Sequence, residues 1–292
     1  MTADPTPRAD SKEFPVKNTD DRSSTSSYEQ ASDHAPVALI TGASSQLGAA
    51  FARHLAAQGY RLVLTSRHLD GLAAVAEDVE SRYRVVTETL VADLAEFAER
   101  QRVIDRLVDP RYPVQMLVNN AGVGLAADFA DSDWETEARM IEVNFTAPMH
   151  LIHGALPAFL RRGGRIVNVC SIAGLFPDGS YGATKAGLVA FSRWAHARYH
   201  ADGVNVTALC PGLLDTDFHV NSGVDVSHRP KWSFTEVDQV ALEGLAAVHK
   251  GDPLCIPGRA AKLLARSAKV LPNRLVASIA RKRPLTGSSE QD

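Results

Sequence analysis

The amino-acid sequence predicts a single α/β domain in which buried strands alternate with helices. Two observations lead to this fold class. Short runs of apolar and β-branched residues recur between residues 36 and 256, and stretches whose apolar residues follow helical spacing separate them. A chain of 292 residues is long enough to bury one large core, and the regular alternation favours one domain over two.

The composition excludes several classes of protein. The 34 acidic and 31 basic residues nearly balance, so no overall charge favours nucleic acid as a partner. Cys170, Cys210 and Cys255 lie far apart in apolar segments, which favours buried thiols over disulfides or a metal site. His196 and His200 have no third ligand nearby, so no metal is expected. Without a secretory leader or an apolar run of ~18 residues, we expect a cytoplasmic protein.

Residues 1–35 predict a disordered N-terminal arm. They are rich in Ser, Thr, Asp and Pro and contain few apolar side chains, so folding would bury too little surface to offset the entropy of ordering. A docking or regulatory tail stays open as the alternative for this segment.

The first segment expected to be ordered predicts a dinucleotide site. Residues 36–41 are a short β-rich run, residues 42–48 are a glycine-containing turn, and an alanine-rich helical stretch continues to about Gln58. This order directs backbone N–H groups and a helix N-terminus at a phosphate, whereas glycines without such neighbours only mark a turn. The residues expected at this site are Gly42, Ser44, Gln46, Leu47 and Gly48.

The second strand, residues 60–65, ends at Ser66 and Arg67. In nucleotide-binding folds an acidic residue at this point binds the adenosine ribose, while a neutral residue beside an arginine accommodates a 2′-phosphate. Because neither residue is a carboxylate, the sequence favours NADP(H) over NAD(H). An ordinary surface arginine is the alternative reading of Arg67.

Two further strands end in small or polar residues. The elements expected here are a helix over 68–82, a strand over 85–91, a helix over 95–108 and a strand over 114–118. Asp93 and Leu94 follow the first of these strands, and Asn120, Ala121 and Gly122 follow the second. Ligands of open α/β sheets bind at the carboxyl ends of the strands, so we expect these residues beside the cofactor. Asp93 can equally be a helix N-cap.

Residues 131–162 predict two helices or one long bent helix, with Asn144 in an apolar setting. A buried asparagine has to be hydrogen-bonded, and a structural bond to a neighbouring loop is the simplest reading. Pro148 is expected to bend the helix nearby and to leave a carbonyl available to water.

A hydroxyl, a phenol and an ammonium group occur within fifteen residues of one another. Ser171 follows an apolar run at 165–170 that predicts a buried strand, so its hydroxyl is expected at a strand's carboxyl end. Tyr181 and Lys185 are four apart in a predicted helix over 180–200, and this spacing places them on one helix face. A nearby cation favours the phenolate, which suits a tyrosine to acid–base catalysis.

The C-terminal third completes the alternation with a strand over 204–210, a helix over 235–250 and a strand around 253–256. Residues 217–234 read as a loop, yet they contain Phe218, Trp232 and Phe234. Bulky apolar side chains in a loop suggest a flap that closes on an apolar ligand. Leu175 and Phe176, after Ser171, point to the same kind of ligand.

The last segment, residues 259–292, is a basic amphipathic tail. Residues 259–283 hold eight basic residues and no acidic one, interleaved with leucine, valine and isoleucine. Two interpretations stay open. Such a helix can contact an anionic membrane at its cytoplasmic face, or it can pack on its own domain with the cationic side in solvent.

With these residues identified, the segment from about 36 to 256 resembles the short-chain dehydrogenase/reductase family. The matching motifs, in family order, are Thr41-Gly-x-x-x-x-x-Gly48, Asp93, Asn119-Asn-Ala-Gly122, Asn144, Ser171, Tyr181-x-x-x-Lys185 and Pro211-Gly-x-x-x-Thr216. The resemblance implies one catalytic domain, residues 36–258, with a doubly wound, Rossmann-like sheet of about seven parallel strands. It also implies a homodimer or homotetramer formed through the helices over 144–162 and 180–200.

The resemblance assigns roles to the matching residues. Tyr181 exchanges a proton with the substrate oxygen, Ser171 orients and polarises that oxygen, and Lys185 lowers the tyrosine pKa and holds the nicotinamide ribose. Asn144 positions a water in the proton relay. The implied cofactor contacts are Asp93 with Leu94 at the adenine, Asn120, Ala121 and Gly122 near the adenosine ribose, and Thr216, in the turn with Pro211 and Gly212, at the cofactor's amide or phosphate.

Two features depart from the family pattern. Gln46 stands where the family carries a small residue, so its amide is expected either to crowd the pyrophosphate or to bond it. The segment between Ser171 and Tyr181 is about three residues shorter than in the family, so the substrate entrance has an unusual shape.

Two functions follow from these patterns. The first is an NADP(H)-dependent oxidoreductase that interconverts an alcohol and a lipophilic ketone or aldehyde. The second is a non-catalytic NADP-binding regulator or scaffold, which would have no use for an activated phenol.

Overall fold

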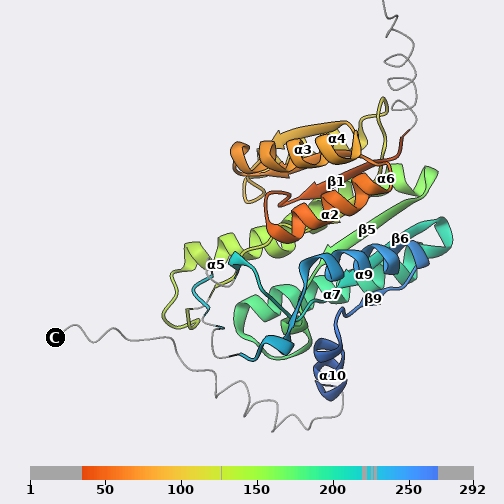
Figure 1. Ribbon diagram of the computed structural model, residues 1–292. Helices are drawn as coiled ribbons and strands as arrows, with labels where there is room; N and C mark the ends of the chain where they lie inside the picture. The colour runs from red at the N-terminus through yellow and green to blue at the C-terminus, as the bar shows by residue number, and fades with distance from the viewer. Residues whose placement is uncertain (1–34, 126, 219–221, 225, 227–228, 269–292) are drawn as a thin grey trace, which may run out of the picture. The chain divides into compact units, whose positions relative to one another are not determined.

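The computed structural model describes residues 35–268, apart from residue 126 and residues 219–221, 225, 227 and 228 (Figure 1). The described residues belong to one compact unit of the chain that begins at Ala35. The predicted arm up to His34 and the tail beyond Ala268 lie outside the described residues, so both assignments stay predictions.

One sheet of seven strands forms the centre of this unit, in the order β3-β2-β1-β4-β5-β6-β9, and all its strands are parallel (Figure 1). The strands are β1 (Val37–Thr41), β2 (Arg61–Ser66), β3 (Thr87–Val91), β4 (Val114–Asn119), β5 (Gly164–Val169), β6 (Val204–Leu209) and β9 (Leu254–Cys255). The predicted doubly wound parallel sheet is therefore confirmed. β3 starts two residues later than predicted, since its pairing with β2 begins at Thr87.

Alternate side chains of β1 enter two separate cores. Ala38 and Ile40 pack with buried residues of α2, α3 and α9, whereas Val37 and Leu39 pack with α4, α6 and α7. Each face of the sheet is thus covered by three helices, as expected for strands that are apolar on both faces. The helices are α2 (Gln46–Ala57), α3 (Leu69–Tyr83), α4 (Phe97–Val108), α6 (Ala147–Arg162), α7 (Gly179–Tyr199) and α9 (Val237–Lys250).

The strand order reverses between β1 and β4, and polar bonds join the carboxyl ends of these two strands. The Thr41 hydroxyl accepts hydrogen bonds from the backbone N–H groups of Asn120 and Ala121, both at 3.0 Å. The Asn120 amide donates to the carbonyls of Thr41 and Gly42, both at 2.9 Å. This reversal is the point at which open α/β folds bind nucleotides, so the bonds fix the floor of the expected site.

The predicted bend within residues 131–162 is a π-helical turn. α5 (Trp134–Ile141) runs into the π-helix η1 (Glu142–Thr146), which leads into α6. Pro148 has no N–H to donate to the carbonyl of Asn144, four residues earlier, so the regular α-helical bond cannot form there. The turn widens instead, and the N–H of Ala147 bonds the carbonyl of Glu142, five residues earlier.

A two-stranded parallel ladder closes the base of the predicted flap. β7 (Leu213–Leu214) pairs with β8 (Phe234–Thr235), so the two ends of the intervening segment lie side by side. The segment itself contains a helical turn that begins at Asp217 and a short 3-10 helix, η4 (Lys231–Ser233). The described residues of the segment are therefore more regular than the loop predicted from the sequence.

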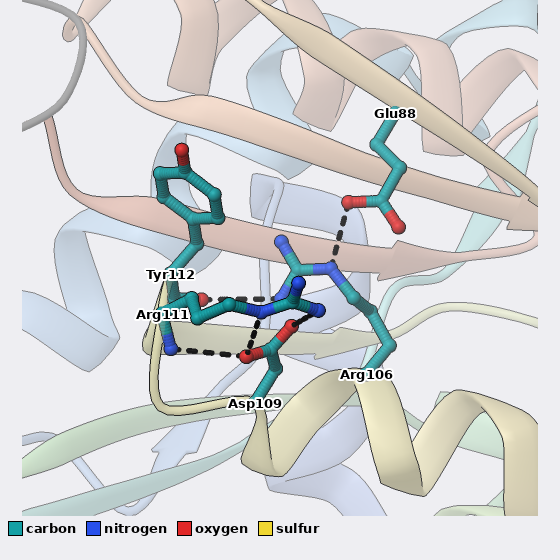
Figure 2. Close-up of polar contacts among 5 residues, drawn as sticks. All are labelled: Glu88, Arg106, Asp109, Arg111 and Tyr112. Atoms are coloured by element: carbon teal, nitrogen blue, oxygen red, sulfur yellow. Dashed lines mark hydrogen bonds and ion pairs between the residues drawn. The ribbon is translucent and has the colours of Figure 1, made fainter.

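A polar cluster fixes the connection between α4 and β4 at the opposite, amino-terminal edge of the sheet (Figure 2). Arg106 donates through Nε to Glu88 at 2.7 Å and through Nη1 to the carbonyl of Tyr112 at 3.1 Å. Asp109 accepts from the side chain and the backbone N–H of Arg111, and these bonds lower its pKa to about 2. Figure 2 shows two ion pairs, Arg106 with Glu88 and Asp109 with Arg111, and a bond from Arg106 to the main chain of Tyr112 across the turn, which indicates a structural role.

The first part of the basic tail forms α10 (Arg259–Ala268), which packs on the domain. Ala261 and Ala265 are buried, and Lys262 pairs with Glu243 of α9 at 3.0 Å. Leu263, by contrast, is 72% exposed. No helix in the described part of the chain is long and apolar enough to cross a membrane.

Candidate active site

Tyr181 and Lys185 lie one turn apart near the start of α7, as the spacing predicts. The Lys185 Nζ atom lies 5.8 Å from the centroid of the Tyr181 ring. Lys185 is buried, and its Nζ donates to the carbonyl of Val169, at the end of β5, at 3.0 Å. The ammonium group is thus held between the last residue of a strand and the phenol.

Burial lowers the pKa of Lys185, since the surroundings give its charge little solvation. The thiols of Cys170 and Cys210 lie close enough to oppose this effect. A hydrogen bond with Cys170 and then desolvation raise the pKa of Cys210. Both cysteines are free and buried, as predicted, and they line the lysine's apolar surroundings.

Asn144, in the π-helix η1, lies close to Lys185. Its Oδ1 accepts from the N–H of Val123 at 2.9 Å, and its Nδ2 donates to the Val123 carbonyl at 2.8 Å. Gly122 lies between the asparagine and the lysine: a Cβ atom there would be 3.3 Å from both Asn144 Oδ1 and Lys185 Nζ. The structure therefore brings Asn144, Lys185 and the chain after β4 into contact distance.

Ser171 emerges at the end of β5 and begins the 3-10 helix η2 (Ile172–Leu175), where its Oγ accepts from the N–H of Ala173 at 3.1 Å. The short connection to α7 is possible because Gly174 lets η2 lie directly on that helix. A Cβ atom at Gly174 would come within 2.7 Å of backbone atoms of Lys185 and Ala186. The compressed segment thus packs on the turn that carries the lysine.

The glycine-rich turn, residues 42–48, is a cradle of closely packed backbone in which Gly42 and Gly48 leave no room for a side chain. Gly42 has a φ of +62°, and a Cβ on it would lie 2.9 Å from Ala121 Cα. A Cβ on Gly48 would lie 2.3 Å from the carbonyl oxygen of Gly42. Ser45 caps α2 by accepting from the N–H of Gly48, Leu47 is buried, and Ser44 is exposed at the turn. The helix N-terminus is therefore exposed for an anion, as the motif predicts.

Gln46 forms a hydrogen bond within the protein, whereas the sequence suggested that its amide would crowd or bond the pyrophosphate. It is the first residue of α2, and its Oε1 accepts from the backbone N–H of Asp217 at 3.0 Å. The amide thus reaches across to the segment after Thr216.

Just after β3, Asp93 is held in an ion pair with Arg139 of α5. Burial acts to raise the pKa of Asp93, but hydrogen bonds from Arg139 and the N–H of Ala95, with the charges of Arg139 and Arg67, lower it overall. The bond to Ala95 closes a local turn two residues long, whereas α4 has Glu96 as its N-cap, so the helix-capping alternative for Asp93 is wrong. Ser66 bonds the backbone of His68, and Arg67 is exposed beside it.

Arg100 joins the loop after β3 to the π-helical turn that carries Asn144. Its Nη1 donates to the carbonyls of Leu94 at 2.8 Å and Ala95 at 3.0 Å, and to Glu142 at 2.7 Å. Its side chain is only 6% exposed. One guanidinium therefore connects the loop after β3 with the π-helix.

We expect Arg100→Ala to lower the free energy of unfolding by about 2–4 kcal/mol, because the change removes a buried charged donor from three acceptors. Urea unfolding followed by circular dichroism measures the effect. Arg102→Ala, at an exposed position of the same helix, is the matched control. Equal stabilities of the two variants would contradict a bridging role for Arg100.

The turn after β6 supplies the remaining predicted residues. The carbonyl of Pro211 accepts from the N–H of Ile172 at 3.0 Å, and Gly212 lets α10 approach, since a Cβ there would lie 3.1 Å from that of Ala261. Thr216 Oγ1 is buried and has no hydrogen-bond partner among the described residues. An unpaired buried hydroxyl and a glycine cradle both fit a bound dinucleotide, which would supply phosphate and amide groups to them.

The fold and these contacts can now be compared with known proteins. The sequence profile of the family described as short chain dehydrogenase matches residues 36–226. The chain belongs to the short-chain dehydrogenase family. This short-chain dehydrogenase is 38% identical over 191 residues to sulfoacetaldehyde reductase 2 of Chromohalobacter salexigens, which covers 62% of this chain and 74% of that protein.

Two solved structures have the same fold. A short-chain dehydrogenase from Sphingobium yanoikuyae in complex with NADPH superposes with a TM-score of 0.73 at 29% identity, over 88% of this chain and 99% of that one. The bulky-bulky ketone specific alcohol dehydrogenase from Comamonas testosteroni gives a TM-score of 0.70 at 25% identity, over 87% and 97% of the two chains.

The sequence missed the residues whose roles depend on distant partners. Arg100 and Arg139 hold the loop after β3, and Phe218 lies 6.2 Å from Tyr181, ring centroid to ring centroid. The sequence predicts Phe218 as part of a flap that closes on an apolar ligand, but not its contact with Tyr181. Trp232 was grouped with it, but that side chain is 76% exposed.

Proposed function

We propose that this short-chain dehydrogenase is an NADP(H)-dependent oxidoreductase that interconverts an alcohol and a lipophilic ketone or aldehyde. The observation that carries the proposal is the Lys185 ammonium, buried 5.8 Å from the Tyr181 ring, with Asn144 on the other side of Gly122. A protein that only bound the nucleotide could use Lys185 to hold the ribose, but it would gain nothing from a phenol activated by that buried cation.

The cofactor, when bound, supplies a hydride to the carbonyl carbon. Tyr181 gives its phenolic proton to the carbonyl oxygen, which becomes the hydroxyl of the alcohol, and oxidation reverses this transfer. Lys185 stabilises the phenolate that is left. The Ser171 hydroxyl, which already accepts from Ala173, keeps its own proton to donate to the same substrate oxygen.

The phenolate must then regain a proton, and Asn144 supports this step through its backbone. Both ends of its side chain are bonded to Val123, so its amide is committed to the fold. Its main-chain carbonyl lies four residues before Pro148 and receives no bond from that position. We assign this carbonyl to a water that passes protons towards Lys185 and Tyr181.

We infer the cofactor contacts from the same geometry. We place the pyrophosphate at the cradle of Gly42 and Gly48 and the carboxamide near Thr216. The amide of Asn120 donates to the carbonyls of Thr41 and Gly42, so we assign it to cofactor binding only as the residue that holds this turn against the ribose. The NADPH complex of the Sphingobium yanoikuyae relative supports a phosphorylated cofactor here.

Arg67 tests the choice of cofactor. We expect Arg67→Ala to weaken NADPH binding about 10-fold to 100-fold, the loss of one charge-assisted contact, and to leave NADH binding nearly unchanged. Fluorescence titration of both cofactors measures this. Arg82→Ala, on α3, is the control, since that arginine pairs with Asp78. An unchanged NADPH affinity in Arg67→Ala would show that no 2′-phosphate lies there.

The proposed reaction is tested with a panel of ketones and aldehydes, following the oxidation of NADPH by its absorbance. The named specificities of the two relatives suggest bulky ketones and small aldehydes as starting substrates. NADPH binding without turnover of any carbonyl would favour a regulator or scaffold instead. Cytoplasmic location and a homodimer or homotetramer stay predictions; sedimentation equilibrium decides the second.

A further inference from the structure

The bond between Gln46 and Asp217 joins two parts of the site that are 171 residues apart in sequence. Gln46 belongs to the glycine-rich turn, on the pyrophosphate side. Asp217 begins the helical turn that follows Thr216, on the substrate side. A small residue at position 46 could not reach that N–H, so the bond depends on the feature that departs from the family pattern.

Phe218, the next residue, lies against the acid–base tyrosine. Its ring centroid is 6.2 Å from that of Tyr181, and the two planes are inclined by 48°. Its Cζ atom would be 3.1 Å from a Cβ on Gly124, so the ring also reaches the chain after β4. Phe218 therefore occupies space beside the phenol, where a substituent of the carbonyl substrate would lie.

Hydrogen bonds hold the backbone before and after the Phe218 side chain. Gln46 bonds the residue before it, and Ser222 bonds the residue itself: the carbonyl of Phe218 accepts from the Ser222 Oγ at 2.6 Å and from its N–H at 3.0 Å. Ser222 is buried and packs on Gly124. The ladder between β7 and β8 fixes the ends of the whole segment.

We propose that Gln46 is a positioning residue that holds Phe218 beside Tyr181, and that Phe218 limits the size of the substituent a carbonyl substrate carries there. The inference rests on the proposed function. A large aromatic ring in a packed site discriminates between substrates by steric exclusion, which is worth tens-fold to hundreds-fold in kcat/KM. Removing the ring, or its anchor, should admit bulkier ketones.

The experiment compares benzophenone with acetophenone, which differ in one phenyl group. We expect Phe218→Ala to raise the ratio of kcat/KM for benzophenone to kcat/KM for acetophenone at least about tenfold. Gln46→Met should raise the same ratio at least about threefold. Gln46→Met keeps the length of the side chain but removes the acceptor. The double variant should match Phe218→Ala, because Gln46 acts only through Phe218.

Two controls separate positioning from other effects. Gln58→Met makes the same substitution at the other end of α2 and should leave the ratio unchanged. Gln46→Glu keeps an acceptor oxygen and should restore the wild-type ratio. An unchanged ratio in Phe218→Ala overturns size selection, and a double variant whose effects add overturns the action of Gln46 through Phe218.

A second readout does not depend on turnover. Chymotrypsin cleaves after phenylalanine only where the chain can open, so we expect Gln46→Met to speed cleavage after Phe218 and Gln58→Met not to. Equal cleavage rates overturn the positioning role. A wild-type protein that reduces no carbonyl overturns the proposed function and the size selection together, while faster cleavage in Gln46→Met would still support the anchor.

Discussion

Tyr181→Phe is expected to lower kcat/KM for carbonyl reduction about 10³-fold to 10⁴-fold, because the ring remains but the proton donor is lost. The change keeps the packing against Phe218 and Lys185, so the fold and the NADPH affinity should persist. Steady-state rates measure the first effect and fluorescence titration of NADPH the second. The split between binding and turnover marks a group that acts on the substrate.

Tyr199→Phe is the matched control for this prediction. It removes a hydroxyl from the same helix, α7, but at its far end, where the ring packs edge-on against Trp194. We expect wild-type rates from this variant. Turnover by Tyr181→Phe within a few-fold of wild type would refute the assigned acid and would require another proton donor.

Lys185→Met is expected to lower kcat/KM about 100-fold while leaving the fold intact. A unit charge 5.8 Å from the phenol ring is worth about 3 kcal/mol at an effective dielectric constant of about 20. Methionine fills a similar volume without the cost of a buried charge, so stability at pH 7 should match or exceed that of wild type. Steady-state rates test the expected loss of kcat/KM, and urea unfolding tests the expected stability. A strongly destabilised variant would show that Lys185 is a structural residue.

The pH dependence of stability gives an independent check on the same lysine. Because burial lowers the pKa of Lys185, the unfolded chain binds more protons than the folded protein between that lowered pKa and about 10.4. Across this window the free energy of unfolding of wild type should therefore rise with pH relative to Lys185→Met. The thiols of Cys170 and Cys210 are present in both proteins, so the difference isolates the lysine. If the free energies of unfolding of wild type and Lys185→Met changed with pH in parallel, the lowered pKa of a buried Lys185 would be contradicted.

Local patterns were sufficient for most of the fold. The strands at the centre of the sheet are apolar on both faces, and each predicted one appears within a few residues of its expected limits. The i, i+4 spacing of Tyr181 and Lys185 places them together because a helix repeats every 3.6 residues. Pro148 marked the bend, since a missing N–H is visible in a sequence; the π-helical form of the bend was not.

Long-range contacts were beyond the sequence. The partner of Gln46 lies in a segment that reads as an irregular loop, and nothing in either stretch marks the other. Arg100 and Arg139 look like ordinary charges of amphipathic helices, yet they hold the loop after β3. Trp232 and Phe218 share one loop and one chemical type, but only the folded chain separates the exposed ring from the one beside Tyr181.

The sequence by itself determined the alternation of strands and helices, the glycine turn and the residue types available for proton transfer. Each of these depends on neighbours in the chain, through hydrophobic period, backbone sterics or helical spacing. Only the tertiary structure decided that Asn144 commits its side chain to Val123, that Arg100 joins two loops, and that Gln46 anchors the residue before Phe218. Those contacts arise when strands order themselves across the sheet, because pairing and packing then bring together residues that no local pattern connects.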